Sequence, residues 1–177
     1  MADASRLFLP IARERVVVQE DGPYAVLTLH RAANTEPERL RALVGVLNAS
    51  PWTYVFPVHP RTRHVLDTHA IELGPNIRAL EPLGYLEMLV LLAGADRVVT
   101  DSGGLQKEAY WLRVPCVTLR ANTEWVDTVY AGANTLVDPA SPGGLDAALA
   151  AARFPDDAPQ LYGDGNASAR ITDLLRS

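Results

Sequence analysis

The chain has 177 residues, 48% hydrophobic and 21% charged, which suits one globular domain with its own core. Its formal net charge of −5 argues against nucleic acid as the main partner, because nucleic-acid-binding domains are typically basic. The longest apolar stretch, 86–95, is too short to cross a bilayer. No signal peptide is evident, so we expect a cytoplasmic protein without a membrane contact.

Residues 23–177 alternate between apolar strands and helix-like stretches, after a lead-in segment 1–22 without a clear pattern. The strands are apolar on both faces, as in parallel sheets covered by helices on both sides. Cys116, the single cysteine, lies in one of them and is expected to be a buried thiol. The predicted strands are 24–30, 53–59, 76–80, 96–100, 115–120 and 134–138. The predicted helices are 37–50, 61–70, 84–95, 103–113, 123–132, 143–154 and 166–175.

This alternation predicts an α/β fold with a doubly wound, mostly parallel, Rossmann-like sheet. In such sheets, ligands bind outside the carboxyl ends of the strands, at the point where the strand order reverses. The residues that follow the strands are therefore the candidate functional residues.

The segment Asp-Ser-Gly-Gly follows the strand 96–100 and begins a helix. The first turn of a helix leaves N–H groups without partners, and glycines let an anion approach them closely. Ser102 adds a hydroxyl, and Glu108 lies near the end of the second turn, where it could accept hydrogen bonds from ribose. The same residues would also serve as a simple helix cap at a tight turn, so this motif alone leaves both interpretations open.

Two further strands end in a histidine and an arginine, in TLHRAANT (28–35) and PVHPRTR (57–63). Arginine pairs well with phosphate oxygens, and histidine can donate to phosphate or move protons near neutral pH. His59, His64 and His69 are spaced by five, so they do not share a helix face as metal-binding i, i+4 pairs do. We therefore predict a phosphate site, with no metal and no cofactor.

The ordered set of TLHRAANT, FPVHPRTR, VVTDSGGLQKEAYWL and YGDGNASARI resembles the C-terminal half of the non-hydrolysing UDP-N-acetylglucosamine 2-epimerases. The resemblance covers roughly residues 22–176. It implies one half of a glycosyltransferase-B architecture, in which two Rossmann-like domains hold a nucleotide sugar between them. It also implies a role in making cell-envelope polysaccharide.

By this resemblance, His30 is a catalytic residue that acts near the phosphates or the leaving group, and Arg31 accompanies it. His59 faces the cleft and helps to bind the nucleotide sugar. Gly84 and Tyr85 lie near the uracil.

The same resemblance implies that the diphosphate of UDP binds at three consecutive residues and that Glu108 binds the ribose. The three residues are Ser102, Gly103 and Gly104.

Two features depart from the family pattern. Ala33 stands where the family usually has Glu, which puts the local hydrogen bonding in question, and Ala121-Asn122 precede Thr123-Glu124 where an acidic residue is common. The family's N-terminal domain, with the carboxylates that handle the proton at C2 of the sugar, has no counterpart in this sequence. We therefore expect little epimerase activity from the chain alone.

The expected partners are UDP or a UDP-N-acetylhexosamine, a separate N-terminal-half chain, and a second copy in a homodimer. Three alternatives stay open: a stand-alone UDP-sugar-binding module, half of a split glycosyltransferase, and a degenerate domain that binds nothing. The pair HRAANT and HPRTR favours the epimerase over a transferase.

Overall fold

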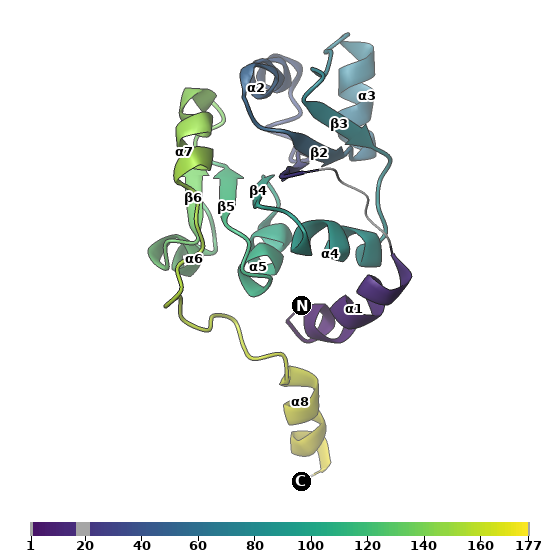
Figure 1. Cartoon of the computed structure of the whole chain (residues 1–177), viewed down its shortest axis with the longest axis vertical. Coiled ribbons are helices and arrows are strands. Elements are labelled where there is room, and N and C mark those ends of the chain that lie inside the picture. Colours follow the sequence, from purple (N-terminus) through teal and green to yellow (C-terminus); the bar gives the residue numbers. More distant parts are fainter. Residues whose placement is uncertain (1, 17–21, 177) are drawn as a thin grey trace.

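The computed structural model describes residues 2–16 and 22–176. Strands and helices alternate through most of this part of the chain (Figure 1). The strands are β1 (Ala25–Thr28), β2 (Tyr54–Pro57), β3 (Ile77–Leu80), β4 (Arg97–Thr100), β5 (Cys116–Leu119) and β6 (Asn134–Val137). The helices are α1 (Ala2–Arg15), α2 (Pro37–Ala49), α3 (Pro60–Thr68), α4 (Tyr85–Ala93), α5 (Gly103–Trp111), α6 (Val126–Tyr130), the 3-10 turn η1 (Pro142–Gly144), α7 (Leu145–Ala151) and α8 (Ala167–Arg176).

The six strands form one parallel sheet in the order β3-β2-β1-β4-β5-β6. The chain builds outward from β1 to β3, and then returns to the other side of β1 with β4. In the central pair, Val26 lies beside Val98 and Thr28 beside Thr100. The order of the strands therefore reverses between β1 and β4, which confirms the doubly wound fold and places the switch point between these two strands.

Two apolar layers cover the sheet. On one face, leucines of α2, α3 and α7 pack against Leu27, Phe56 and Val117 of the strands. On the other face, α4 and α5 pack against Val26, Val98 and the strand residue before Val117. That residue, Cys116, is 3% exposed and burial raises its pKa to about 12, so the predicted buried thiol is confirmed.

The structure differs from the sequence-based expectation at several elements. Residues 2–15 form a regular helix, α1, which packs on α4 and α5. Helix α6 is shorter than the predicted 123–132, because buried Thr123 donates to Gln106 and accepts from the amide of Trp125, which holds a loop there. Glycine is a poor helix former, and Pro142–Gly144 accordingly form only a 3-10 turn before α7.

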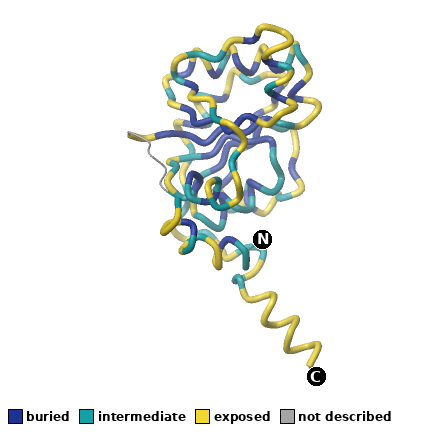
Figure 2. The backbone as a smooth tube through the Cα atoms, turned by 90° about the vertical axis from the view of Figure 1, so that its right-hand side faces the viewer, coloured by how far each residue is buried: buried dark blue, intermediate teal, exposed yellow. Residues whose placement is uncertain are grey.

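Helix α8 projects away from the sheet, and its residues are exposed along its length (Figures 1 and 2). Its apolar side chains include Ile171 and Leu175, which are 56% and 82% exposed. Among residues 2–16 and 22–176, no helix combines the length and the apolar character that crossing a bilayer requires.

Candidate functional site

The carboxyl ends of β1 and β4 meet at the switch point. The hydroxyls of Thr28 and Thr100, the last residues of these strands, are 2.6 Å apart and buried. Beyond them the chain continues into the loop 29–36 on one side and into Asp101 and Ser102 on the other. The two sequence motifs HRAANT and DSGG are therefore neighbours in space.

Asp101 organises the loop that carries the first histidine. Its carboxylate is fully buried and accepts hydrogen bonds from the amides of His30 (3.0 Å) and Arg31 (2.9 Å), and from the side-chain amide of Asn34 (3.2 Å). Its Oδ1 lies 3.0 Å from Nδ1 of His30. Burial acts to raise the pKa of Asp101, but the hydrogen bonds from His30 and Arg31 and the charge of His30 outweigh it and hold the pKa below its ordinary value.

The departure at Ala33 leaves this loop intact. Ala33 is exposed, whereas its neighbour Asn34 is buried and donates to Asp101 and to the carbonyl of Leu119, at 3.0 Å. The loop is therefore held by Asn34 and Asp101, and its conformation does not need a carboxylate at position 33.

The second histidine lies beside the first. His59 precedes α3, and its Nδ1 accepts a hydrogen bond from the amide of Arg61 at 3.2 Å. Buried Thr62 donates to the carbonyl of Leu29, which ties the start of α3 to the end of β1. As a result the rings of His30 and His59 have centroids 5.6 Å apart, so the structure brings these two predicted residues together.

The N-terminus of α5 opens onto the same edge of the sheet. Ser102 caps the helix, and its hydroxyl accepts from the amide of Leu105 at 3.4 Å, while its own amide donates to Thr100 Oγ1 at 2.9 Å. Among the described residues, the amides of Gly103 and Gly104 have no hydrogen-bond partner. Two N–H groups at the positive end of the helix dipole are thus available to an anion.

Sequence reasoning missed two charged residues at this edge, Arg120 and Glu124. Arg120 follows β5, and its NH1 lies 2.7 Å from Oε2 of Glu124, whose Oε1 lies 3.8 Å from NH2 of Arg31. Burial acts to raise the pKa of Glu124, but hydrogen bonding and the two arginine charges hold it below its ordinary value. The position of Arg120 directly after a central strand was the signal that could have found it.

Glu108 lies on α5, and burial raises the pKa of its carboxyl group. Tyr85 begins α4, and its ring makes an edge contact with Phe8 of α1 at 6.1 Å, with its hydroxyl 3.4 Å from the hydroxyl of Ser5. Gly84 is the N-cap of α4, and its amide donates to Glu87 at 2.7 Å. Within the described part of the chain, no ring contact, ion pair or hydrogen bond joins these residues to the histidine pair.

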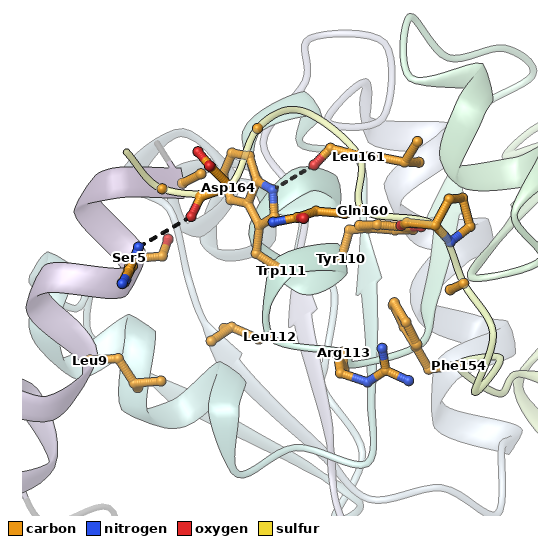
Figure 3. A pocket seen from close by; sticks show the side chains of 16 residues that line it. Ser5, Leu9, Tyr110, Trp111, Leu112, Arg113, Phe154, Gln160, Leu161 and Asp164 are labelled. Atoms are coloured by element: carbon orange, nitrogen blue, oxygen red, sulfur yellow. Dashed lines mark hydrogen bonds between the residues drawn. The ribbon is translucent and has the colours of Figure 1, made fainter. Parts of the chain in front are cut away.

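A cavity of about 410 Å³ lies at the other end of α5, between α1, Trp111 and the segment 154–165 (Figure 3). Two of the side chains that line it donate to backbone carbonyls of this segment: Tyr110 donates to Pro159 at 2.6 Å, and Trp111 donates to Leu161 at 3.1 Å. Because these bonds hold the segment 154–165 against α5, we assign this cavity a structural role and place the candidate site at the switch point.

Comparison with known proteins shows the family to which the chain belongs. A family model described as UDP-N-acetylglucosamine 2-epimerase matches residues 1–176. A UDP-N-acetylglucosamine 2-epimerase homolog of Methanococcus maripaludis is 42% identical over 159 residues, 87% of this chain and 44% of the relative. The UDP-2,3-diacetamido-2,3-dideoxy-D-glucuronate 2-epimerase of Pseudomonas aeruginosa is 40% identical over 180 residues, 99% of this chain and 50% of the relative.

Solved structures agree with these relatives. The crystal structure of Methanocaldococcus jannaschii UDP-GlcNAc 2-epimerase in complex with UDP-GlcNAc and UDP matches with a TM-score of 0.82 and 34% identity. The match covers 99% of this chain and 52% of that structure. The chain therefore spans about half the length of the relatives it matches.

Proposed function

Because the chain belongs to the UDP-N-acetylglucosamine 2-epimerase family, we propose that it is the C-terminal, UDP-binding half of an enzyme that interconverts UDP-N-acetylglucosamine and UDP-N-acetylmannosamine. One observation carries the proposal: the open N-terminus of α5 meets two histidines and two arginines at the switch point of the sheet. These are His30 and His59, and Arg31 and Arg120. Helix N-termini and arginine forks both favour phosphate oxygens. We also propose that the protein is cytoplasmic, which a nucleotide-sugar ligand supports.

In this proposal the diphosphate binds at the start of α5. The amides of Gly103 and Gly104 and the hydroxyl of Ser102 donate to its oxygens, and Arg31 balances its charge. Glu108, five residues after Gly103 along the same helix, accepts hydrogen bonds from the ribose hydroxyls.

The remaining predicted residues contact the other parts of the ligand. His30 acts near the leaving diphosphate, and His59 donates to the nucleotide sugar. Gly84 and Tyr85, at the start of α4, contact the uracil.

Elimination of UDP from the sugar also needs a base at C2, and the carboxylates at this edge are committed elsewhere. Asp101 is buried and its oxygens accept from His30, Arg31 and Asn34. Glu124 is paired with Arg120, and Asp96 precedes β4, at the opposite edge of the sheet from the site.

We therefore propose that the base comes from a complementary N-terminal half, on the same polypeptide or on a separate chain, facing this edge across the sugar. We also propose that the assembled protein is a homodimer. The stand-alone binding module differs from this proposal only in having no such complementary half.

Calorimetric titration with UDP, ADP, uridine and pyrophosphate tests the proposed ligand. Because the site holds both ends of the nucleotide, UDP should bind more tightly than uridine or pyrophosphate, and more tightly than ADP. Equal affinities for UDP and ADP would contradict recognition of uracil. Equal affinities for UDP and pyrophosphate would show that the site recognises only the phosphates.

A further inference from the structure

The two histidines at the switch point have opposite hydrogen-bond surroundings at the same ring atom. Nδ1 of His30 lies 3.0 Å from a carboxylate oxygen of Asp101, which can only accept while it is ionised. Nδ1 of His59 lies 3.2 Å from the amide of Arg61, which can only donate. A neutral imidazole carries one proton, so the partner of one nitrogen decides which nitrogen keeps it.

Each surrounding fixes a different tautomer. His30 keeps its proton at Nδ1, which leaves the lone pair at Nε2. His59 keeps its lone pair at Nδ1, which leaves the proton at Nε2. Both side chains reach the surface, since His59 is exposed and the His30 side chain is 37% exposed.

We propose that Asp101 is a positioning residue which, with the amide of Arg61, fixes His30 and His59 in opposite tautomers at the ligand site. In the neutral rings, Nε2 of His30 is then a hydrogen-bond acceptor, while Nε2 of His59 is a hydrogen-bond donor. The two histidines therefore have different roles, which their similar positions after β1 and β2 do not indicate.

The burial of Asp101 is what gives it this role. The carboxylate is 0% exposed, and it also accepts from the amides of His30 and Arg31. These two hydrogen bonds fix the position of the carboxylate relative to the His30 ring. Two cationic side chains lie near the rings: Arg61, whose NH1 donates to the carbonyl of His30 at 3.4 Å, and Arg31 on the adjoining residue, which faces Glu124 at 3.8 Å. Asp101 is thus the anion that balances an imidazolium at His30.

The proposal rests on the proposed function in one respect, that the ligand at Nε2 is the diphosphate of a nucleotide sugar. As UDP leaves, negative charge develops on the departing oxygen. When His30 is an imidazolium balanced by Asp101, its Nε2–H donates to that oxygen, and Nε2–H of His59 donates to a second oxygen.

Nitrogen NMR of the ¹⁵N-labelled chain tests the proposal directly. Spectra that correlate the ring nitrogens with the carbon-bound ring protons distinguish protonated from unprotonated nitrogens. A pH series then shows which nitrogen each histidine deprotonates. The chain has four histidines, and His30→Gln and His59→Gln variants assign the two signals of interest.

We expect His30 to lose its proton from Nε2 and His59 to lose its proton from Nδ1. The proposal is overturned if His30 deprotonates at Nδ1, or if both rings deprotonate at the same nitrogen. The decisive spectra are those of the wild-type chain, and the two variants serve only to assign its signals.

The Asp101→Asn variant provides a second test by the same NMR measurement. The amide oxygen can still accept from the backbone, but the NH₂ group toward the ring can only donate, as in the Asp-to-Asn change of the serine-protease triad that leaves the histidine in the wrong tautomer. We expect the deprotonated nitrogen of His30 to switch from Nε2 to Nδ1, with His59 unchanged. An unaltered His30 would contradict the role of Asp101.

Asp96→Asn is the matched control, because Asp96 flanks the same strand at its opposite end, and it should leave both tautomers as in the wild type. A UDP titration of the same samples separates the two proposals. If UDP does not bind while the tautomers are as expected, the proposed function fails and the role of Asp101 stands.

Discussion

A β-carbon at Gly103 would lie 2.4 Å from Oε1 of Glu124 and 3.2 Å from Nε1 of Trp125. The missing side chain of Gly103 thus leaves room for Glu124 and Trp125 beside the N-terminus of α5. Glu124, in turn, contacts Arg120 and Arg31, so this glycine controls the placement of two cations at the proposed diphosphate site.

Gly103→Ala should therefore weaken UDP binding while the chain stays folded. The clash is with the end of a flexible side chain, so Glu124 moves and the fold tolerates the change. The displaced Glu124 releases its arginines, and the added methyl group narrows the cradle. We expect the dissociation constant from calorimetry to rise at least about tenfold, equivalent to about 1.4 kcal/mol. Unchanged affinity would show that the ligand does not approach Gly103.

Asp101 should make the stability of the fold depend on pH in the acid range. Its pKa in the folded chain lies below the value of about 3.9 found in unfolded peptides. The unfolded chain therefore binds the proton more readily, and stability rises with pH across this window. The contribution of Asp101 is present above about pH 3.9 and is lost as the pH falls through the folded-state pKa.

Urea unfolding of wild type and Asp101→Asn across this range measures the effect. At neutral pH the variant should be less stable by about 1 to 3 kcal/mol, the cost of leaving buried hydrogen-bonding groups unsatisfied. The difference should shrink as the pH falls below about 3.9. A difference that stays constant with pH would show that the ionised carboxylate is not what the fold requires.

Glu108 should make the stability of the fold depend on pH in the opposite direction, because its pKa in the folded chain is raised by burial. A raised pKa means that the carboxylate form is disfavoured in the fold, so stability is lost as the pH rises through the folded-state value. Glu108→Gln should therefore raise the melting temperature at neutral pH. It should also weaken UDP binding, because a hydrogen bond to a charged acceptor contributes about 1.5 to 3 kcal/mol.

Glu72→Gln is the matched control for that experiment, since Glu72 is exposed on the segment after α3, and it should change neither quantity appreciably. If Glu108→Gln gained stability and kept full affinity for UDP, Glu108 would have no contact with the ribose.

The chain alone should turn over little or no UDP-N-acetylglucosamine. Among the described residues, Asp101 is buried and Glu124 is paired with Arg120, so neither is free to remove the proton at C2. Incubation in D₂O, followed by proton NMR, detects both the epimer and exchange at C2, with a full-length relative as the positive control. Turnover at an ordinary enzymatic rate, about 1 per second or more, would overturn the proposal that a complementary half supplies the base.

The fold could be predicted from the sequence because the strands are apolar on both faces and alternate with helices. That pattern placed the two histidines and Ser102 after β1, β2 and β4, at one edge of a parallel sheet. The pairing of His30 with Asp101 could not be predicted, because it joins residues separated by 71 positions. From the sequence, either Asp101 or Ser102 could be the helix cap, and the structure shows that the cap is Ser102.

The placement of Glu124 was also out of reach, since it depends on a loop held by the buried bond between Thr123 and Gln106. The pattern around Thr123 resembles a helix, and only the tertiary contact shows that it is not one. Tyr85 was predicted near uracil, and its ring contacts α1, an element whose sequence had no clear periodicity because Pro10 and several charged residues interrupt it.

We propose that UDP binds with its diphosphate at the N-terminus of α5. The most direct test of this proposal is calorimetric titration of the wild-type chain with UDP beside Gly104→Asp, which adds a negative charge at the cradle. Gly143→Asp is the charge-matched control, because a β-carbon at this exposed glycine meets nothing within 4 Å. We predict micromolar to low-millimolar binding by the wild type and by Gly143→Asp, and none by Gly104→Asp. Equal binding by all three proteins, or no binding by the wild type, would contradict the account.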